Sequence, residues 1–184
     1  MEKNIQAGLL TELSCQYDFS KFGIVLYAPI TTDSRSDFIA EVNGHFLKIQ
    51  CKSCTVSADG NSFTFSTCSK NWNTKIIKTY EGQIDYFYTC HEGKGYLIPI
   101  SETGKKAKTL RLFAIDENNP SINWAKDYEF EKVLKSIDPS IEEFVKNTAK
   151  EKKKFFCVDC GQEISRKATR CKKCASLMKS EQTK

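Results

Sequence analysis

Three polar residues in and beside two short apolar runs are the first candidates for chemistry. Asp37 precedes the run "FIAEV", and Gln50 and Lys52 lie in and just after the run "HFLKIQC". Asn43-Gly44 joins the two runs and is a strong signal for a two-residue hairpin turn. Pairing the residues that flank this turn places Asp37 directly opposite Gln50, with Lys52 about 5–8 Å away. We therefore expect an acid, an amide and an amine to converge at one end of a hairpin.

Such a cluster suits metal-assisted hydrolysis of a phosphodiester. The Asp37 carboxylate and the Gln50 amide oxygen are hard ligands of the kind that Mg²⁺ prefers, and the backbone carbonyl of Cys51 is a third. Mg²⁺ in such a site polarises the scissile phosphate and lowers the pKa of a bound water. The Lys52 ammonium can orient that water or stabilise charge on the phosphate. Because Gln50 brings no charge, a further carboxylate is expected, and Glu12 in an N-terminal helix is the candidate.

The apolar side of this hairpin is predicted to face the core. Side chains alternate between the two faces of a strand, so the apolar residues of both runs gather on one face. Those residues are Phe38, Ala40, Val42, Leu47, Ile49 and Cys51. The three polar residues take the other face.

One helix and several strands are expected to position the hairpin. Residues 4–20 are predicted to form an amphipathic helix, and residues 22–29 a buried strand. The helix is expected to bury a stripe of side chains at every fourth position: Ile5, Leu9, Leu13 and Tyr17. Further strands are predicted at residues 61–67, 85–90, 95–100 and 109–115.

Two helices are predicted after this strand-rich region. The first spans residues 127–137, and its buried side is expected to hold Tyr128, Val133, Leu134 and Ile137. The second spans residues 139–154; it has Pro139 near its start and lysines near its end, which suits the helix dipole. The order of elements indicates an α/β fold with a helix packed on a mixed sheet, followed by a small C-terminal module.

Four of the nine cysteines lie in the run "CVDCGQEISRKATRCKKC", as two Cys-x-x-Cys pairs separated by ten residues. Each pair places two thiolates on one tight turn, and two pairs complete a tetrahedral Zn²⁺ site of Cys157, Cys160, Cys171 and Cys174. Few apolar residues lie in this run, so bound metal is expected to supply its folding energy, on the order of 10 kcal/mol. A redox dithiol pair and an iron–sulfur cluster are the alternatives.

Basic charge is concentrated around this cysteine cluster. Residues 1–144 carry 16 Lys and Arg against 19 Asp and Glu, whereas residues 145–184 carry 12 against 4. Such segregation suits contact with the phosphate backbone of nucleic acid; a solvated tail and a protein-binding ribbon are the alternatives. The expected DNA contacts are Lys152, Lys153, Lys154, Arg166, Lys167, Arg170, Lys172 and Lys173.

Length and composition exclude several classes of protein. A chain of 184 residues, 40% of them hydrophobic, allows one domain plus a small appendage. No apolar run is long enough to span a membrane, and the N-terminus lacks the layout of a signal peptide. An odd number of cysteines without a secretion signal argues against a disulfide framework. We therefore expect a soluble, cytoplasmic protein.

The order and spacing of these residues resemble the PD-(D/E)xK nuclease superfamily. They are more closely similar to its group I intron-associated, homing-type endonucleases. Gly8 to Glu12 matches a "G-x-x-x-E" helix, Asp37-Phe38 matches a "D-F" strand, and "KIQCKS" matches "K-I-Q-V-K-T". The resemblance covers about residues 4–100 and extends to the strand "YLIPI". Ser36 stands where the motif has proline, and Gln50 stands where it has a second acid, although this branch accommodates glutamine.

The resemblance implies a restriction-endonuclease-like core and a Mg²⁺-dependent DNA endonuclease with Glu12, Asp37, Gln50 and Lys52 as its site. The expected organisation is a nuclease core (1–115), a helical extension (116–154) and a zinc ribbon (155–178). Double-stranded DNA is the implied partner, and a dimer or tetramer is expected because cutting both strands needs two active sites. The neutral Gln50 keeps two alternatives open: a nucleic-acid-binding regulator on a decayed nuclease core, and a Holliday-junction resolvase.

Overall fold

The computed structural model describes residues 3–31, 33–70, 74–113, 122–142, 155–164 and 168–174. The chain divides into two compact units, Met1–Glu142 and Glu143–Lys184, and each is described by itself. None of the helices in these described ranges is long and apolar enough to cross a membrane.

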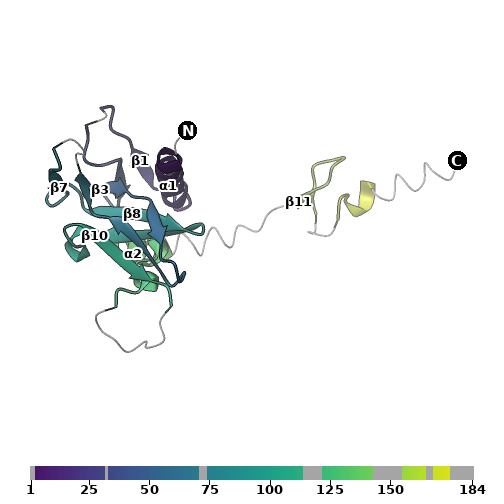
Figure 1. The fold of residues 1–184 in the computed structure, drawn as a ribbon. Coiled ribbons are helices and arrows are strands. Elements are labelled where there is room, and N and C mark those ends of the chain that lie inside the picture. The colour runs from purple at the N-terminus through teal and green to yellow at the C-terminus, as the bar shows by residue number, and fades with distance from the viewer. Residues whose placement is uncertain are drawn as a thin grey trace. The chain divides into compact units, whose positions relative to one another are not determined.

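A five-stranded mixed sheet forms the centre of the first unit (Figure 1). Its strand order is β1-β2-β3-β8-β9, with β3 and β8 parallel and the other neighbours antiparallel. The strands are β1 (Val25–Tyr27), β2 (Phe38–Val42), β3 (His45–Cys51), β8 (Tyr86–His91) and β9 (Lys94–Pro99). The parallel pair matters for the site, because it aligns the end of β3 with the first half of β8.

Two helices, α1 (Lys3–Ser20) and α2 (Phe130–Ile137), pack on one face of this sheet. Phe19 of α1 and Phe130 of α2 meet edge to face, with their ring centroids 4.7 Å apart. The ring of Tyr88 on β8 lies 6.0 Å from Phe130 and joins the helices to the sheet. These contacts confirm the predicted α/β fold with a helix packed on a mixed sheet.

A second, three-stranded sheet covers the opposite face. Its order is β10-β5-β4, formed by β10 (Ala107–Arg111), β5 (Ser62–Ser66) and β4 (Cys54–Val56). Phe65 of β5 packs on Phe87 of β8, with their ring centroids 5.8 Å apart. Phe87 and Tyr88 are adjacent and point to opposite faces. Gln50 pairs with Phe87, so this end of the hairpin's polar face adjoins the second core, whereas Phe46 and Lys48 on the same face are exposed.

Shorter elements complete the first unit. They are the two-stranded hairpin β6 (Cys68–Lys70) and β7 (Ile77–Thr79), and the 3₁₀ helices η1 (Ile100–Glu102) and η2 (Ala125–Asp127). The predicted strand 109–115 is observed as β10, and its last two residues lie outside the described ranges. Of the predicted helix 139–154, residues beyond 142 also lie outside them.

The register of the β2–β3 hairpin is the predicted one. Val42 pairs with His45, and Phe38 pairs with Ile49. Asn43 has φ 49° and Gly44 has φ 75°, the left-handed values that a two-residue turn of this kind requires. The turn sequence therefore fixes which residues of β3 face Asp37.

The predicted buried stripe of α1 is wrong. Its four members are 46–67% exposed: Ile5, Leu9, Leu13 and Tyr17. The buried side of the helix instead carries Thr11, Cys15, Asp18 and Phe19. Asp18 tolerates burial because its Oδ2 accepts a hydrogen bond of 2.6 Å from the Tyr88 hydroxyl and its Oδ1 pairs with Lys21 at 2.7 Å. The Tyr88 hydroxyl of β8 thus allows a polar face of α1 to point into the protein.

The strand predicted at residues 22–29 is present as β1, but it is not buried. It is short and forms the edge of the five-stranded sheet, and Val25 and Tyr27 are 53% and 46% exposed. Tyr27 packs beside the exposed Phe46, with their ring centroids 6.2 Å apart. The predicted burial failed because Val25 and Tyr27 point to the sheet face opposite α1, which they share with Glu41 and the exposed Phe46.

The prediction for the helix at 127–137 holds for three of its four buried residues. Tyr128, Val133 and Leu134 are buried, whereas Ile137, in the last turn of α2, is half-buried.

Candidate active site

The predicted polar residues meet where β3 ends beside β8. Asp37 immediately precedes β2, and its backbone amide donates to the Ile49 carbonyl at 2.9 Å. The Gln50 amide nitrogen Nε2 donates to Asp37 Oδ2 at 2.5 Å. The backbone amide of Cys51 donates to the same oxygen at 2.7 Å. The structure therefore brings Asp37 and Gln50 into direct contact.

Lys52 directly follows the last residue of β3, at the same end of the strand. Its backbone amide donates to the Tyr88 carbonyl at 2.9 Å, which holds it in line with the parallel pair. Its ammonium Nζ lies 5.0 Å from the centre of the Tyr80 ring, within the range of a cation–π contact. Burial raises the pKa of Asp37, and the positive charge of Lys52 partly offsets that rise. The amine therefore lies near enough to the carboxylate for the two charges to interact.

Glu12 reaches this place from α1. Burial raises the pKa of its carboxyl, and the negative charge of Asp37 raises it further. The pKa of Asp37 is also raised, because the cost of burying its charge exceeds the help from the Cys51 amide, Lys52 and Gln50. Burial and mutual repulsion make the negative charges of these two carboxyl groups unfavourable. A cation bound between them would remove this cost.

The chemistry of the donor set fits Mg²⁺. Glu12 and Asp37 offer carboxylate oxygens, the Cys51 carbonyl offers a backbone oxygen, and Gln50 offers its amide oxygen, all hard ligands. In the hydrogen-bonded arrangement, Gln50 turns Nε2 toward both Asp37 and the Cys51 carbonyl, at 2.5 and 3.2 Å. For its oxygen to join a cation at Asp37, the amide must turn over. Gln50 is 7% exposed, so this turn takes place inside the protein.

The raised pKa of Asp37 predicts a pH-dependent stability. A carboxyl whose pKa is raised on folding adds stability below its ordinary value, here 3.8, and that stability is lost as the pH rises through the folded-state value. Asp37→Asn should therefore raise the unfolding temperature of the metal-free protein at neutral pH, and the gain should vanish in acid. Thermal unfolding in EDTA, between about pH 4 and 8, measures this.

The matched control for this change is Asp33→Asn, which alters an exposed acid of the same loop. It should leave the unfolding temperature unchanged. Added Mg²⁺ should then stabilise the wild-type protein and not the Asp37→Asn protein, since only a site that binds the ion gains stability from it. A lower unfolding temperature for Asp37→Asn at neutral pH would contradict the electrostatics described above.

A pair of buried thiols lies behind the site. Cys51 points to the core face, as predicted, and its thiol contacts that of Cys15 on α1. This contact and burial raise the pKa of Cys51, so it stays a neutral, small core residue. Because Glu12 lies one turn before Cys15, the thiol contact fixes the helix that carries Glu12 against the strand that carries Gln50.

Two residues near the site were missed by the sequence analysis, Arg35 and Tyr80. The Arg35 guanidinium stacks 3.8 Å from the centre of the Tyr80 ring, which also carries Lys52. Tyr80 is 4% exposed and packs edge to face on Phe87. The only signal in the sequence was the position of Arg35, two residues before Asp37.

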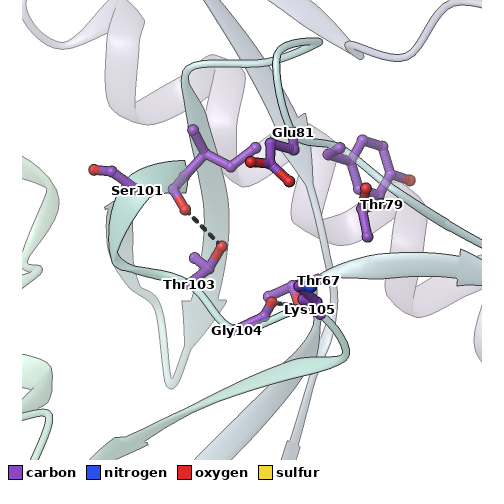
Figure 2. Close-up of a pocket in the computed structure, with 9 residues that line it drawn as sticks. Thr67, Thr79, Glu81, Ser101, Thr103, Gly104 and Lys105 are labelled. Carbon is purple, nitrogen blue, oxygen red and sulfur yellow. Dashed lines mark hydrogen bonds between the residues drawn. The ribbon is translucent and has the colours of Figure 1, made fainter.

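A pocket of about 420 Å³ has Tyr80 in its lining (Figure 2). Its walls include Thr67, Thr79, Thr103 and Glu81. The Thr67 hydroxyl donates to the Gly104 carbonyl and the Thr103 hydroxyl to the Ile100 carbonyl, at 2.5 and 2.8 Å. Glu81 is the one carboxylate in this lining, so the pocket lacks the paired acids of a catalytic metal site.

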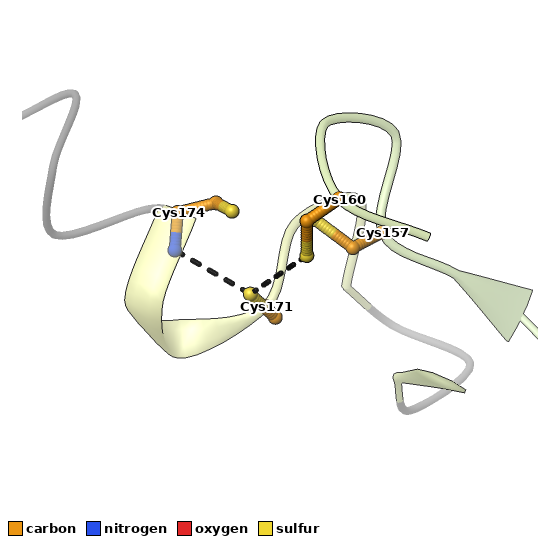
Figure 3. A group of neighbouring side chains, drawn as sticks. All are labelled: Cys157, Cys160, Cys171 and Cys174. Atoms are coloured by element: carbon orange, nitrogen blue, oxygen red, sulfur yellow. Dashed lines mark hydrogen bonds between the residues drawn. The ribbon is translucent and has the colours of Figure 1, made fainter. Parts of the chain in front are cut away.

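The cysteine cluster of the second unit is assembled as predicted (Figure 3). The four sulfur atoms lie within 4.8 Å of one another, and Cys160 and Cys171 are 3.7 Å apart. Zn–S bonds of about 2.3 Å in a tetrahedron place sulfurs about 3.8 Å apart, so this spacing suits one ion. The short strands β11 (Phe155–Phe156) and β12 (Glu163–Ile164) pair beside the first two cysteines. The four cysteines can therefore hold a metal ion.

The predicted DNA contacts are described only in part. Arg170 pairs with Asp159 through a contact of 2.7 Å, and Lys172 and Lys173 are exposed. The other members of that set lie outside the described residues: Lys152, Lys153, Lys154, Arg166 and Lys167.

Comparisons with known proteins agree with this geometry. A sequence model of the PD-(D/E)XK endonuclease family matches residues 3–131. Protein 5.3 of Escherichia phage T7 is 25% identical over 120 residues, which span 61% of this chain and all of that protein. The solved structure of I-Ssp6803I, a bacterial homing endonuclease, superposes with a TM-score of 0.56 at 16% identity, over 82% of this chain and all of that one. The likeness to that structure is one of fold.

Proposed function

Because the chain belongs to the PD-(D/E)XK endonuclease family, we propose that it hydrolyses phosphodiester bonds of double-stranded DNA with Mg²⁺. The proposed site consists of Glu12, Asp37, Gln50 and Lys52. The observation that supports it best is that the Gln50 amide and the charge of Lys52 meet at a half-buried carboxyl, Asp37, whose pKa is raised by burial. A solvated surface cluster would show no such shift.

Each residue has a role that follows from its position. Asp37, Glu12 and the turned-over amide of Gln50 would hold Mg²⁺, which supplies Lewis-acid stabilisation of the phosphate and an acidified water. Lys52 is held on Tyr80, from where its ammonium stabilises negative charge on the scissile phosphate. The backbone amide of Cys51 keeps the Asp37 carboxylate in one orientation, which reduces the cost of assembling the site.

We propose a homing or mobile-element role in the cytoplasm. The bacterial homing endonuclease of similar fold supports it, as does the phage relative. A nuclease core of residues 1–115 would be joined by a helical extension, 116–154, to a Zn²⁺ module at 155–178. That module, with Lys172 and Lys173 exposed on it, would lengthen the DNA footprint, since an enzyme of this type must recognise a long site.

We also propose a homo-oligomer, dimer or tetramer, that forms through the exposed face of α1. Its stripe of Ile5, Leu9, Leu13 and Tyr17 is 46–67% exposed along the helix. An exposed apolar stripe of this kind marks an interaction site. A second copy suits it, because the four-residue spacing lets two such helices interlock about a twofold axis. Pairing there would bring two sites to one duplex.

Charged substitutions on α1 test this arrangement. Leu9→Lys with Leu13→Lys should convert an oligomer into a monomer, because each copy would bury two charges at the interface. Light scattering during size exclusion measures the mass. Phe113→Lys, a change at an apolar residue exposed elsewhere, is the matched control and should leave the oligomer intact. A wild-type monomer, with and without DNA, would refute the arrangement.

Incubation of the purified chain with supercoiled plasmid tests the function directly. Mg²⁺ should yield nicked and linear DNA, EDTA should yield neither, and RNA of matched length should remain intact. A duplex carrying an intron-insertion-type site should be cut at one position if the enzyme is of the homing type. A four-way junction cut faster than any duplex would favour a junction resolvase instead.

A regulator on a decayed nuclease core is the second candidate. The neutral Gln50 favours it, because the amide satisfies Asp37 by hydrogen bonding without a cation. Such a protein would bind DNA with unchanged affinity in Mg²⁺ and in EDTA, and it would cut none.

A further inference from the structure

The β6–β7 hairpin differs in charge from the rest of the first unit. Residues 68–79 contain Lys70, Lys75 and Lys78 and no acid, although residues 1–144 carry more acids than bases. The three lysines are exposed, and the hairpin is a separate two-stranded sheet. A basic two-stranded ribbon has the width that the major groove of DNA admits.

Arg35 fixes the base of this hairpin beside the proposed active site. Its Nη1 donates to the Ser69 hydroxyl at 3.1 Å, and its Nη2 donates to the Thr79 carbonyl at 2.9 Å. Its Nε donates to Gln83 Oε1 at 2.6 Å, and its guanidinium stacks on Tyr80. Arg35 lies two residues before Asp37. Its side chain therefore holds both strands of the ribbon next to the loop that carries Asp37.

The register of the hairpin directs Lys78 toward the same side. Ser69 and Lys78 are paired across the strands and therefore share a face, and Arg35 contacts this face through Ser69. Arg35 and Lys52 both lie over the ring of Tyr80, at 3.8 and 5.0 Å from its centre. Lys78, Arg35 and Lys52 are thus the cations on the side of the ribbon that adjoins the proposed site, whereas Lys70 pairs with Ile77 on the other face.

A neighbouring loop adds two further cations. The Thr67 amide donates to the Lys106 carbonyl at 3.1 Å, so this loop lies against the start of β6. Lys105 and Lys106 are both exposed there. Lys105 also lines the pocket shown in Figure 2, whose lining includes the acid Glu81 as well.

We propose that the β6–β7 hairpin is a phosphate-binding ribbon for duplex DNA, which it holds next to the Asp37–Lys52 site. The lysines of the ribbon bind the phosphates of the duplex. Arg35 sets the position of the ribbon by joining it to the loop that carries Asp37. The proposal rests on the proposed nuclease function, because it assigns a DNA-contacting element to that same site.

The test compares two triple variants of the full chain by fluorescence anisotropy on a labelled duplex in EDTA, over a range of salt concentrations. Lys70, Lys75 and Lys78 are changed to alanine in one. Lys126, Lys132 and Lys135 are changed in the other, which removes the same charge from a segment where Asp127 and Glu131 pair with the last two lysines. Thermal unfolding confirms that both variants are folded.

The ribbon variant should bind at least tenfold more weakly than wild type at near-physiological salt. Its plot of log affinity against log salt should be shallower by about 2–3, since each lost phosphate contact removes about 0.9. The control should match wild type. Equal slopes for both variants would overturn the ribbon proposal while leaving nuclease activity intact. A wild-type chain that binds DNA and never cuts it would overturn the nuclease function and not the ribbon.

Discussion

Asp37→Ala should lower the single-turnover rate of DNA cleavage by about 10³-fold or more, equivalent to about 4 kcal/mol of transition-state stabilisation. Asp37 is the centre of the proposed site: it accepts hydrogen bonds from Gln50 and Cys51, and its charge interacts with Glu12 and Lys52. Alanine removes the carboxylate to which Gln50 and the Cys51 amide donate, and with it a proposed ligand of Mg²⁺.

A loss of rate has this meaning only if the variant still folds and binds DNA. Affinity for a labelled duplex in EDTA should stay at the wild-type value or rise slightly, because alanine removes a negative charge near the phosphates. Asp33→Ala, in the same loop and exposed, should cut at the wild-type rate. If Asp37→Ala cuts as fast as wild type, the hydrolytic site lies elsewhere in the chain.

Cys171→Ser should reduce the zinc content from one ion per chain to almost none and unfold the second unit. The Cys171 sulfur is central to the cluster, since Cys160 lies 3.7 Å from it and the Cys174 amide donates to it at 3.4 Å. The folding of so small a module depends on the metal. Metal analysis together with limited proteolysis measures both effects.

The first unit provides the control for this change. Cys68→Ser alters a half-buried thiol of β6 and should keep the full zinc content. The unfolding temperature of the first unit should be the same in both variants, because its core contains none of the four cluster cysteines. Full zinc retention in Cys171→Ser would refute the four-cysteine zinc site.

The contact between Asp37 and Gln50 was predictable because it follows from a local turn. Asn43-Gly44 permits one tight turn, that turn sets one register, and the register places Gln50 against Asp37. The grouping of the four cysteines was predictable for a similar reason, since two Cys-x-x-Cys turns need little tertiary context.

The orientation of α1 was not predictable, because the helix carries apolar residues on more than one side. Its inward face was decided by a distant partner, the Tyr88 hydroxyl, which satisfies Asp18 and allows a polar side to be buried. Arg35 and Tyr80 were missed for the same kind of reason. Their roles depend on contacts with Ser69, Thr79 and Lys52, which adjoin them only in the folded chain.

The Mg²⁺ dependence of the single-turnover cleavage rate of the wild-type chain tests the central claim most directly. A site built from Asp37, Glu12 and Gln50 predicts a rate that is absent in EDTA, rises with Mg²⁺ to saturation, and needs more Mg²⁺ as the pH falls, because protons compete for carboxyls whose pKa is raised. DNA cleavage that persists in EDTA, or no cleavage at any Mg²⁺ concentration while DNA is bound, would contradict it.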